Sequence, residues 1–198
     1  MVDFRSLRNA EAQSNLDFPI KESPSQTAGP YVHIGCLPNF VGVNGVYPKD
    51  LTINGALPDG DKITIKGFVY DGDGAIAKDI MIESWQANSA GDLKNGIWRR
   101  MPTDLETGEF KLETIMPGSV DGNSPYINLW IVARGINIGL NTRIYFEDNL
   151  DEKDMVWKHV PKERQFTLIA KRVEGGYKFD IRLQGSLEGE DETVFFDI

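Results

Sequence analysis

The chain has 198 residues, of which 40% are hydrophobic and 10% aromatic, and it carries a formal net charge of −9 at pH 7. This length predicts one structural domain that can bury a substantial core, and the composition is typical of a globular protein. The negative charge argues against nucleic acid or an anionic membrane as a partner, because binding to either requires a basic face.

The cysteine count and the absence of targeting features predict a cytoplasmic protein. Cys36 is the single cysteine, so the chain can form neither an internal disulfide nor a thiolate zinc cluster, and we expect a bystander thiol in a reducing compartment. Residues 1–15 carry charges without an apolar core and do not resemble a secretory signal. No segment approaches the roughly 18 apolar residues of a membrane span.

The chain starts with a long stretch that has few periodic features. Residues 1–17 are polar and mixed, and residues 18–62 are rich in proline, glycine and asparagine. Such a composition is typical of irregular structure. We therefore expect residues 1–62 to form an N-terminal arm and an irregular segment that lies across a body built from residues 63–198, within a single structural domain.

Strands are predicted from Lys62 to near the C-terminus. In the clearest of them, Tyr177–Leu183, apolar residues alternate with polar residues, which is the period of a strand with one buried face. The segment Asp71-Gly72-Asp73-Gly74 predicts a hairpin turn rather than a calcium loop, which would need a late bidentate glutamate. The predicted strands cover Lys62–Tyr70, Asp79–Ala87, Glu109–Ile115, Ile127–Arg134, Arg143–Phe146, Phe166–Lys171 and Tyr177–Leu183.

This succession of short strands predicts an all-β fold, namely a β-sandwich of mostly antiparallel strands with little helix. Leu150–Lys158 alone has a marginally helical pattern. His33 and His159 are the two histidines and lie far apart in the sequence, whereas a transition-metal site normally needs two or three nitrogen ligands in close array. The sequence therefore argues against a metal site contained in this chain.

Two unusual segments suggest a binding site. Pro24–Gly35 (PSQTAGPYVHIG) offers a hydroxyl, a small bend and an amphipathic ring, and Ala133–Phe146 (ARGINIGLNTRIYF) places Arg134 at the end of a predicted strand. An arginine can bind a carboxylate through two hydrogen bonds, and a tyrosine hydroxyl can add a third. From the chemistry alone, an ion-paired surface role for Arg134 remains the alternative.

These segments, together with IESWQANSAG, GEFKLETIMPG, FDIRLQG and ETVFFDI, resemble the intradiol ring-cleavage dioxygenases. The resemblance covers nearly all of residues 22–198, and several long motifs in one order make it specific. Within that family the motifs are similar to the α subunits of heteromeric members. The resemblance implies a β-sandwich, and αβ protomers assembled into a larger oligomer.

For this chain the resemblance implies an enzyme subunit that is inactive alone and has no catalytic residue of its own. A separate β subunit would bind Fe³⁺ through two tyrosines and two histidines. The complex would cleave 3,4-dihydroxybenzoate with O₂ to give 3-carboxy-cis,cis-muconate. The α chain would contribute substrate-binding residues to the shared pocket, and these are Thr27, Gly29, Pro30, Tyr31 and Arg134.

The positions that hold iron in the β subunit fall on unsuitable residues in this chain. The two histidines fall on Tyr126 and Asn128, and the two tyrosines fall near Leu93 and Val120. Leucine and valine have no donor atom, and an amide is a poor substitute for imidazole. The resemblance therefore implies that this chain binds no metal.

Other functions remain open at this point. A stand-alone, non-catalytic β-sandwich module that binds an aromatic acid or a protein partner would fit the degenerate positions equally well. A homomeric intradiol enzyme with an unconventional iron site fits less well, because the two histidines are distant. Three departures from the α-subunit pattern leave the five pocket candidates in place, and they are the short segment Ser89–Pro102, Asn141 and Tyr126.

Overall fold

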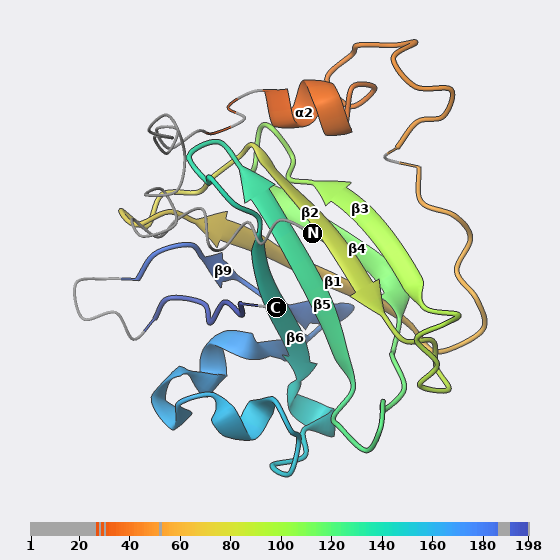
Figure 1. Ribbon diagram of the computed structural model, residues 1–198, viewed down its shortest axis with the longest axis vertical. Coiled ribbons are helices and arrows are strands. Elements are labelled where there is room, and N and C mark those ends of the chain that lie inside the picture. The colour runs from red at the N-terminus through yellow and green to blue at the C-terminus, as the bar shows by residue number, and fades with distance from the viewer. Residues whose placement is uncertain (1–26, 28, 30, 52, 186–190, 198) are drawn as a thin grey trace, which may run out of the picture.

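The computed structural model describes residues 27, 29, 31–51, 53–185 and 191–197, and strands dominate it (Figure 1). A short helix, α2 (Tyr31–Cys36), precedes the first strand, and three 3-10 helices follow β6. The strands are β1 (Lys62–Tyr70), β2 (Ile80–Gln86), β3 (Ile97–Pro102), β4 (Glu109–Ile115), β5 (Tyr126–Ala133), β6 (Leu140–Phe146), β7 (Ile169–Val173), β8 (Gly176–Lys178) and β9 (Ile181–Arg182). The 3-10 helices are η2 (Glu147–Asn149), η3 (Trp157–His159) and η4 (Lys162–Leu168).

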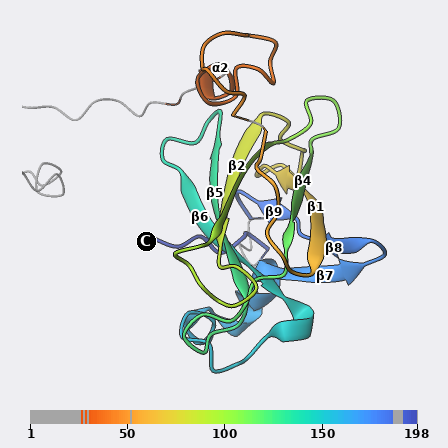
Figure 2. The same ribbon diagram turned by 90° about the vertical axis from the view of Figure 1, so that its right-hand side faces the viewer.

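The strands form one hydrogen-bonded sheet that folds over into two layers (Figure 2). Its order is β3-β2-β5-β6-β7-β8-β1-β4, with β9 beside β1. The first four strands pair antiparallel and form one layer, and β6 then pairs in parallel with β7, which leads into the second layer. This arrangement confirms the predicted all-β sandwich of mostly antiparallel strands with little helix.

Side chains from both layers bury one large apolar core. In β5, Ile127, Leu129 and Ile131 face inward and are at most 1% exposed, whereas Trp130 faces outward. The opposite layer contributes Phe110 from β4, which is fully buried. A register shift of one residue would point each of these side chains toward the solvent. Burial of the apolar face therefore fixes the strand register.

The outer face of the β3-β2-β5-β6 layer is covered at its two ends and open in the middle. At one end the helix α2 is followed by Leu37, which packs against Met81 in a small buried cluster. At the other end the segment between β6 and β7 packs Trp157 edge-on against Tyr145, with ring centroids 5.2 Å apart. The large side chains of the open middle are Trp85, Trp98 and Trp130.

Most predicted strands agree with the structure to within a few residues, and β1 and β4 have the predicted bounds. The sequence pattern does not predict β3, because Arg99 occupies its buried face and interrupts the apolar alternation. Phe166–Lys171 is predicted as one strand, but residues up to Leu168 form η4 and the strand starts at Ile169. The helix α2 lies in a segment expected to be irregular, and six residues are too few to show a helical period.

The strand predicted over Tyr177–Leu183 is divided into β8 and β9, both of which pair in parallel with β1. Between them Asp180 turns its side chain to the sheet, and its Oδ1 accepts the backbone N–H of Phe68 at 3.1 Å. Gly67 lies opposite the interruption, where an added Cβ would be 1.7 Å from the backbone oxygen of Phe179. Glycine is required at this position because the two backbones approach too closely for any side chain.

Replacing Gly67 tests this close approach. We expect Gly67→Ala to lower the free energy of unfolding by about 2–4 kcal/mol, because the methyl group forces β1 away from the C-terminal strands. Urea denaturation of the purified protein measures the effect. Gly55→Ala is the control, since an added Cβ there meets nothing within 4 Å, and an equal midpoint shift in both variants would contradict the argument.

Candidate functional site

The two segments that the sequence singled out lie side by side in the structure. The Thr27 hydroxyl oxygen accepts the backbone N–H of Gly135 at 2.8 Å and that of Gly29 at 3.4 Å. Gly135 follows Arg134 directly and has a φ of 88°, so the chain turns sharply after β5. A hydrogen bond between residues 108 positions apart therefore places the start of α2 next to Arg134.

Arg134 forms an ion pair with Asp79 that the strand register dictates. Ile80 pairs with Ala133 in the β2–β5 ladder, so Asp79 and Arg134 are the next residues beyond it on neighbouring strands. The Nε and Nη2 atoms of Arg134 both lie 2.6 Å from Oδ2 of Asp79. The arginine side chain is 62% exposed and that of Asp79 is 23% exposed, so the cation remains accessible to a ligand.

Of the five predicted pocket residues, the structure brings Thr27, Gly29 and Arg134 together, and Pro30 lies outside the described residues. Tyr31 opens helix α2 and is 71% exposed. Its ring is therefore available to a partner or ligand above the surface. The geometry places a hydroxyl, a left-handed glycine and an accessible guanidinium at one end of the sandwich.

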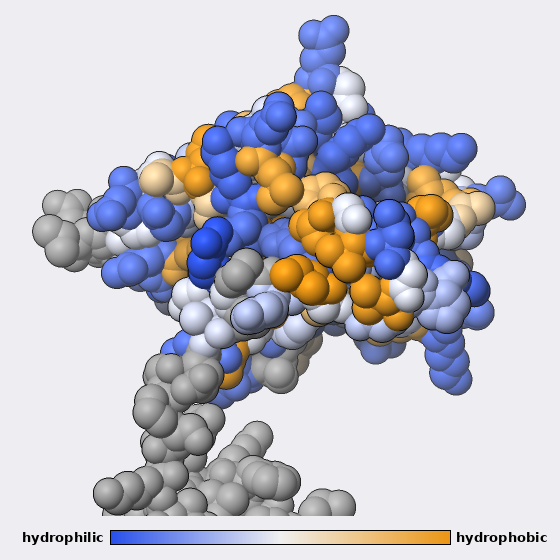
Figure 3. All heavy atoms as spheres, turned by 90° about the horizontal axis from the view of Figure 1, so that it is seen from above, coloured by the Kyte–Doolittle hydropathy of each residue, from blue (hydrophilic) through white to orange (hydrophobic). Residues whose placement is uncertain are grey.

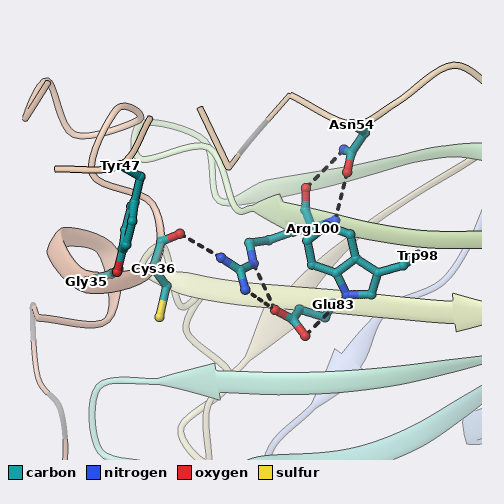
Figure 4. Close-up of polar contacts among 7 residues, drawn as sticks. All are labelled: Gly35, Cys36, Tyr47, Asn54, Glu83, Trp98 and Arg100. Atoms are coloured by element: carbon teal, nitrogen blue, oxygen red, sulfur yellow. Dashed lines mark hydrogen bonds and ion pairs between the residues drawn. The ribbon is translucent and has the colours of Figure 1, made fainter. Parts of the chain in front are cut away.

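A network around Arg100 holds α2 on the sheet (Figure 4), and the sequence did not reveal it. The Arg100 guanidinium donates to Glu83 Oε1 at 2.5 and 2.8 Å and to the backbone oxygen of Cys36, the last residue of α2, at 2.9 Å. Asn54 accepts the backbone N–H of Arg100 and donates to its carbonyl. The Tyr47 hydroxyl donates to the backbone oxygen of Gly35 at 2.7 Å.

Alternating exposure along β2 and β3 places Glu83 and Arg100 on the outer face, where the ladder pairs them directly. Their side chains are 21% and 17% exposed, which shields the ion pair from water and strengthens it relative to a fully exposed pair. The pairing of Glu83 with Arg100 could have been predicted only if the position of β3 were known. The role of Arg100 in fixing α2 depends on its hydrogen bond to Cys36, which is 64 residues away in sequence.

A cavity of about 350 Å³ opens beside the Arg134–Asp79 pair. Its apolar lining comes from Ile34, Val41, Val43 and Leu105. Seen from above, apolar side chains gather on this end of the molecule (Figure 3). Pockets that combine apolar walls with a few charged groups are typical of small-molecule sites.

His33 lines the same cavity from α2 and is 4% exposed. Its ring stacks on Phe40 with centroids 6.0 Å apart, and Nε2 has no hydrogen-bond partner among the described residues. Burial lowers the pKa of His33 below its ordinary value of 6.5; the charge of Asp79 opposes this shift and that of Arg134 adds to it. The imidazole is therefore neutral at pH 7, and its unpaired nitrogen is an unusual feature in a buried position.

The degenerate iron positions lie elsewhere, toward the middle and opposite end of β5. Asn128 Oδ1 accepts the Nε–H of Arg143 at 3.0 Å, and the Arg143 guanidinium lies 4.1 Å from the centre of the Tyr126 ring. Val120 packs against the aromatic cluster around Tyr126, and Leu93 is half-buried in the turn before β3. A fixed cation thus contacts two of the four positions, and these residues do not fit a ferric ion.

These two regions are too far apart to act on one small molecule. Asn128 and Arg134 are six residues apart, Asn128 within β5 and Arg134 just after it, and a strand rises about 3.3 Å per residue, so their backbones are about 20 Å apart. A single-ring acid held by Arg134 cannot reach Asn128. Within the described ranges, moreover, no cluster of three or more histidine, cysteine, aspartate or glutamate side chains could hold a metal ion.

Solved structures share this fold. An intradiol ring-cleavage dioxygenase from Tetranychus urticae superposes with a TM-score of 0.54 at 14% identity, covering 70% of this chain and 88% of that one. Catechol 1,2-dioxygenase from Acinetobacter radioresistens gives a TM-score of 0.51 at 16% identity, with 77% and 67% covered. The sandwich is therefore the fold of the intradiol ring-cleavage dioxygenases.

Sequence relatives narrow the assignment, although no family model matches the chain. The protocatechuate 3,4-dioxygenase alpha chain of Pseudomonas putida is 41% identical over 200 residues, covering 90% of this chain and 97% of that one. The alpha chain of Burkholderia cepacia is 36% identical, with 90% and 98% covered, and the beta chain of that organism is 30% identical, with 71% and 73% covered. The chain belongs to the family of protocatechuate 3,4-dioxygenase alpha chains.

One further structural finding concerns membranes. Within the part of the chain that the structure describes, no helix is long and apolar enough to span a bilayer.

The Arg100 network predicts that α2 loosens when the cation is lost. In Arg100→Gln we expect the backbone amides of Tyr31–Cys36 to exchange with solvent about tenfold faster or more, because the helix loses the charged hydrogen bond to its last residue. Hydrogen–deuterium exchange with mass spectrometry reads this out. Lys66→Gln, which removes an exposed ion pair with Glu109, should leave α2 unchanged; equal protection in Arg100→Gln would refute the anchoring role.

Burial of His33 predicts a pH dependence of stability. Because the folded pKa is lowered, the unfolded chain takes up the proton first as the pH falls below about 6.5, and the free energy of unfolding decreases. His33→Gln should lose less stability than the wild type between about pH 7.5 and about pH 5 in urea titrations. Gly55→Ala, which changes no titratable group and meets nothing within 4 Å, should lose as much as the wild type. Parallel curves for His33→Gln and the wild type would show that the imidazole titrates normally.

Proposed function

We propose that this chain is the substrate-positioning α subunit of a cytoplasmic ring-cleaving dioxygenase whose ferric ion is bound by a homologous β subunit. The complex cleaves 3,4-dihydroxybenzoate between its two hydroxylated carbons, and both atoms of O₂ enter the product, 3-carboxy-cis,cis-muconate. The β-bound iron supplies the redox chemistry. The α chain contributes binding residues, and alone it is inactive.

The separation of the two regions along β5 carries this proposal. Arg134 and the cavity lie at one end of the strand, and the degenerate positions at Asn128 and Tyr126 are occupied by contacts with Arg143. A substrate held at Arg134 therefore needs reactive groups from outside this chain. The similarity to a beta chain at 30% identity supports a β subunit of the same fold as the source.

Each predicted pocket residue has a specific positioning role in this proposal. Arg134 binds the carboxylate of the substrate through two charge-assisted hydrogen bonds. The Thr27 hydroxyl oxygen accepts from Gly135 and Gly29, and among the described residues its hydrogen has no acceptor, so it can donate to the substrate. Tyr31 adds a hydrogen bond, and Gly29-Pro30 forms a close wall. Correct orientation of the ring toward the partner can supply a large part of the rate acceleration.

The domain organisation follows from these roles. The N-terminal arm and irregular segment, residues 1–62, contribute to the shared pocket, and residues 63–198 form the sandwich that supports it; residues 1–26, 28, 30 and 52 of that N-terminal part lie outside the described residues. We further propose that αβ protomers assemble into a larger oligomer. The exposed apolar side chains Tyr31 and Ile34 beside the cavity support a close subunit contact at this end of the sandwich.

Removing the charge of Arg134 tests the proposal. In the purified αβ complex, Arg134→Gln should raise KM for 3,4-dihydroxybenzoate by about 30-fold or more, which corresponds to about 2–4 kcal/mol for a lost charge-assisted pair. The preference for this substrate over catechol, which lacks the carboxylate, should fall by a similar factor. Steady-state kinetics with both substrates measure the change.

Arg172→Gln serves as the matched control, because Arg172, on β7, has a side chain of similar exposure, 65%, and pairs with Asp148 at 3.0 Å. It should behave as the wild type. The assignment fails if Arg134→Gln keeps the wild-type KM and preference, or if the isolated α chain shows the full activity of the complex.

A further inference from the structure

We propose that Asp79 is a positioning residue that fixes which edge of the Arg134 guanidinium faces the substrate. The inference rests on the proposed role of Arg134 in binding the carboxylate. The two N–H groups of Arg134 that contact Asp79 are Nε and Nη2, and both meet the single oxygen Oδ2 at 2.6 Å. Asp79 thereby takes the side edge of the guanidinium and leaves the end-on edge, formed by Nη1 and Nη2, for a ligand.

The geometry of the guanidinium makes this choice of edge consequential. Its donors lie in one rigid plane, and a carboxylate forms two parallel hydrogen bonds only with one edge at a time. An exposed arginine without a partner samples many rotamers, and ordering them on binding weakens affinity. The backbone of Asp79 is fixed next to the β2–β5 ladder, so the pair transmits the rigidity of the sheet to the tip of a side chain that is 62% exposed.

The surroundings of the pair favour a role of Asp79 in orienting the Arg134 guanidinium, beyond neutralising its charge. Asp79 and Arg134 both line the cavity of about 350 Å³, whose remaining walls are apolar apart from His33. Low polarity strengthens the hydrogen bonds that remain, and a single-ring acid that fills the cavity removes further water. His33 is neutral and buried beside the pair, so Asp79 has no competing cation on that side. Arg134 is its ion-pair partner among the described residues.

Two possible roles of Asp79 predict opposite changes in the affinity for the carboxylated substrate when Asp79 is removed. If it positions Arg134, its loss weakens binding of the carboxylated substrate. If it merely competes with the substrate for the guanidinium, its loss strengthens binding. A purely structural role would impair turnover of carboxylated and carboxylate-free substrates alike.

The experiment uses the αβ complex with Asp79→Ala, Asp79→Asn and Arg134→Gln, assayed with 3,4-dihydroxybenzoate and with catechol. We expect Asp79→Ala to raise KM for 3,4-dihydroxybenzoate by about 10- to 100-fold, with a smaller change in kcat, and to lower its preference over catechol. Asp79→Asn retains an acceptor oxygen and should show an intermediate effect. Asp148→Ala, which breaks the exposed pair with Arg172, is the control and should match the wild type.

An unchanged or lower KM in Asp79→Ala and Asp79→Asn overturns the inference, as does an equal loss with both substrates. The comparison with Arg134→Gln separates the two proposals. If Arg134→Gln changes the preference and the Asp79 variants do not, only the positioning role fails. If Arg134→Gln leaves the preference unchanged, the proposed substrate contact itself is wrong. Should Asp79→Ala fail to assemble with the β subunit, Asp79→Asn decides the matter.

Discussion

The ion pair between Glu83 and Arg100 is the interaction on which the site depends. It lies on the outer face of the sheet, and its guanidinium also donates to the last residue of α2. Other contacts hold the segment before β1 as well, namely the hydrogen bonds of Thr27 to Gly135 and of Asn54 to the Arg100 backbone, and the apolar side chains around Leu37. The pair adds the charged contact to the end of α2, and the same segment carries Thr27, Gly29 and Tyr31, three of the proposed pocket residues.

One layer of the sandwich, β3-β2-β5-β6, uses arginine in three distinct ways. Arg100 fastens a peripheral segment, Arg134 presents an accessible charge at a rim, and Arg143 fills a region between Asn128 and the ring of Tyr126. Of these three arginines, only Arg134 is more than half exposed, which suits a residue that binds a ligand. Arg143 places a fixed positive charge at the positions where the β subunit is expected to bind the ferric ion. A ferric ion next to this guanidinium would be repelled.

The proposed division of labour between two related chains is compatible with this arrangement. The sequence relatives include both alpha and beta chains. A rigid sheet can carry a metal site in one copy and a substrate-positioning rim in another, because the core is built from the inward-facing residues and the outward-facing residues are free to differ. In this chain the inward set is mainly apolar, and the outward set includes arginine, asparagine and tryptophan.

The sequence by itself determined the fold class and most strands, because alternating burial along Glu109–Ile115 or Ile127–Ala133 is a local pattern that the hydrophobic effect enforces. Through their motifs it also singled out Arg134 and the segment around Thr27 as a candidate site, and the structure places the two side by side. It did not determine β3, where a buried arginine disturbs the alternation, or the division of Tyr177–Leu183, which depends on the approach of Gly67 from a distant strand.

Three contacts join residues that are far apart in the sequence. Arg134 pairs with Asp79 across 55 positions, Arg100 anchors α2 across 64 positions, and Arg143 contacts Asn128 across 15 positions. Only the tertiary structure decided these, since the register between strands, and not the composition of any one segment, brings the charged groups within hydrogen-bond distance.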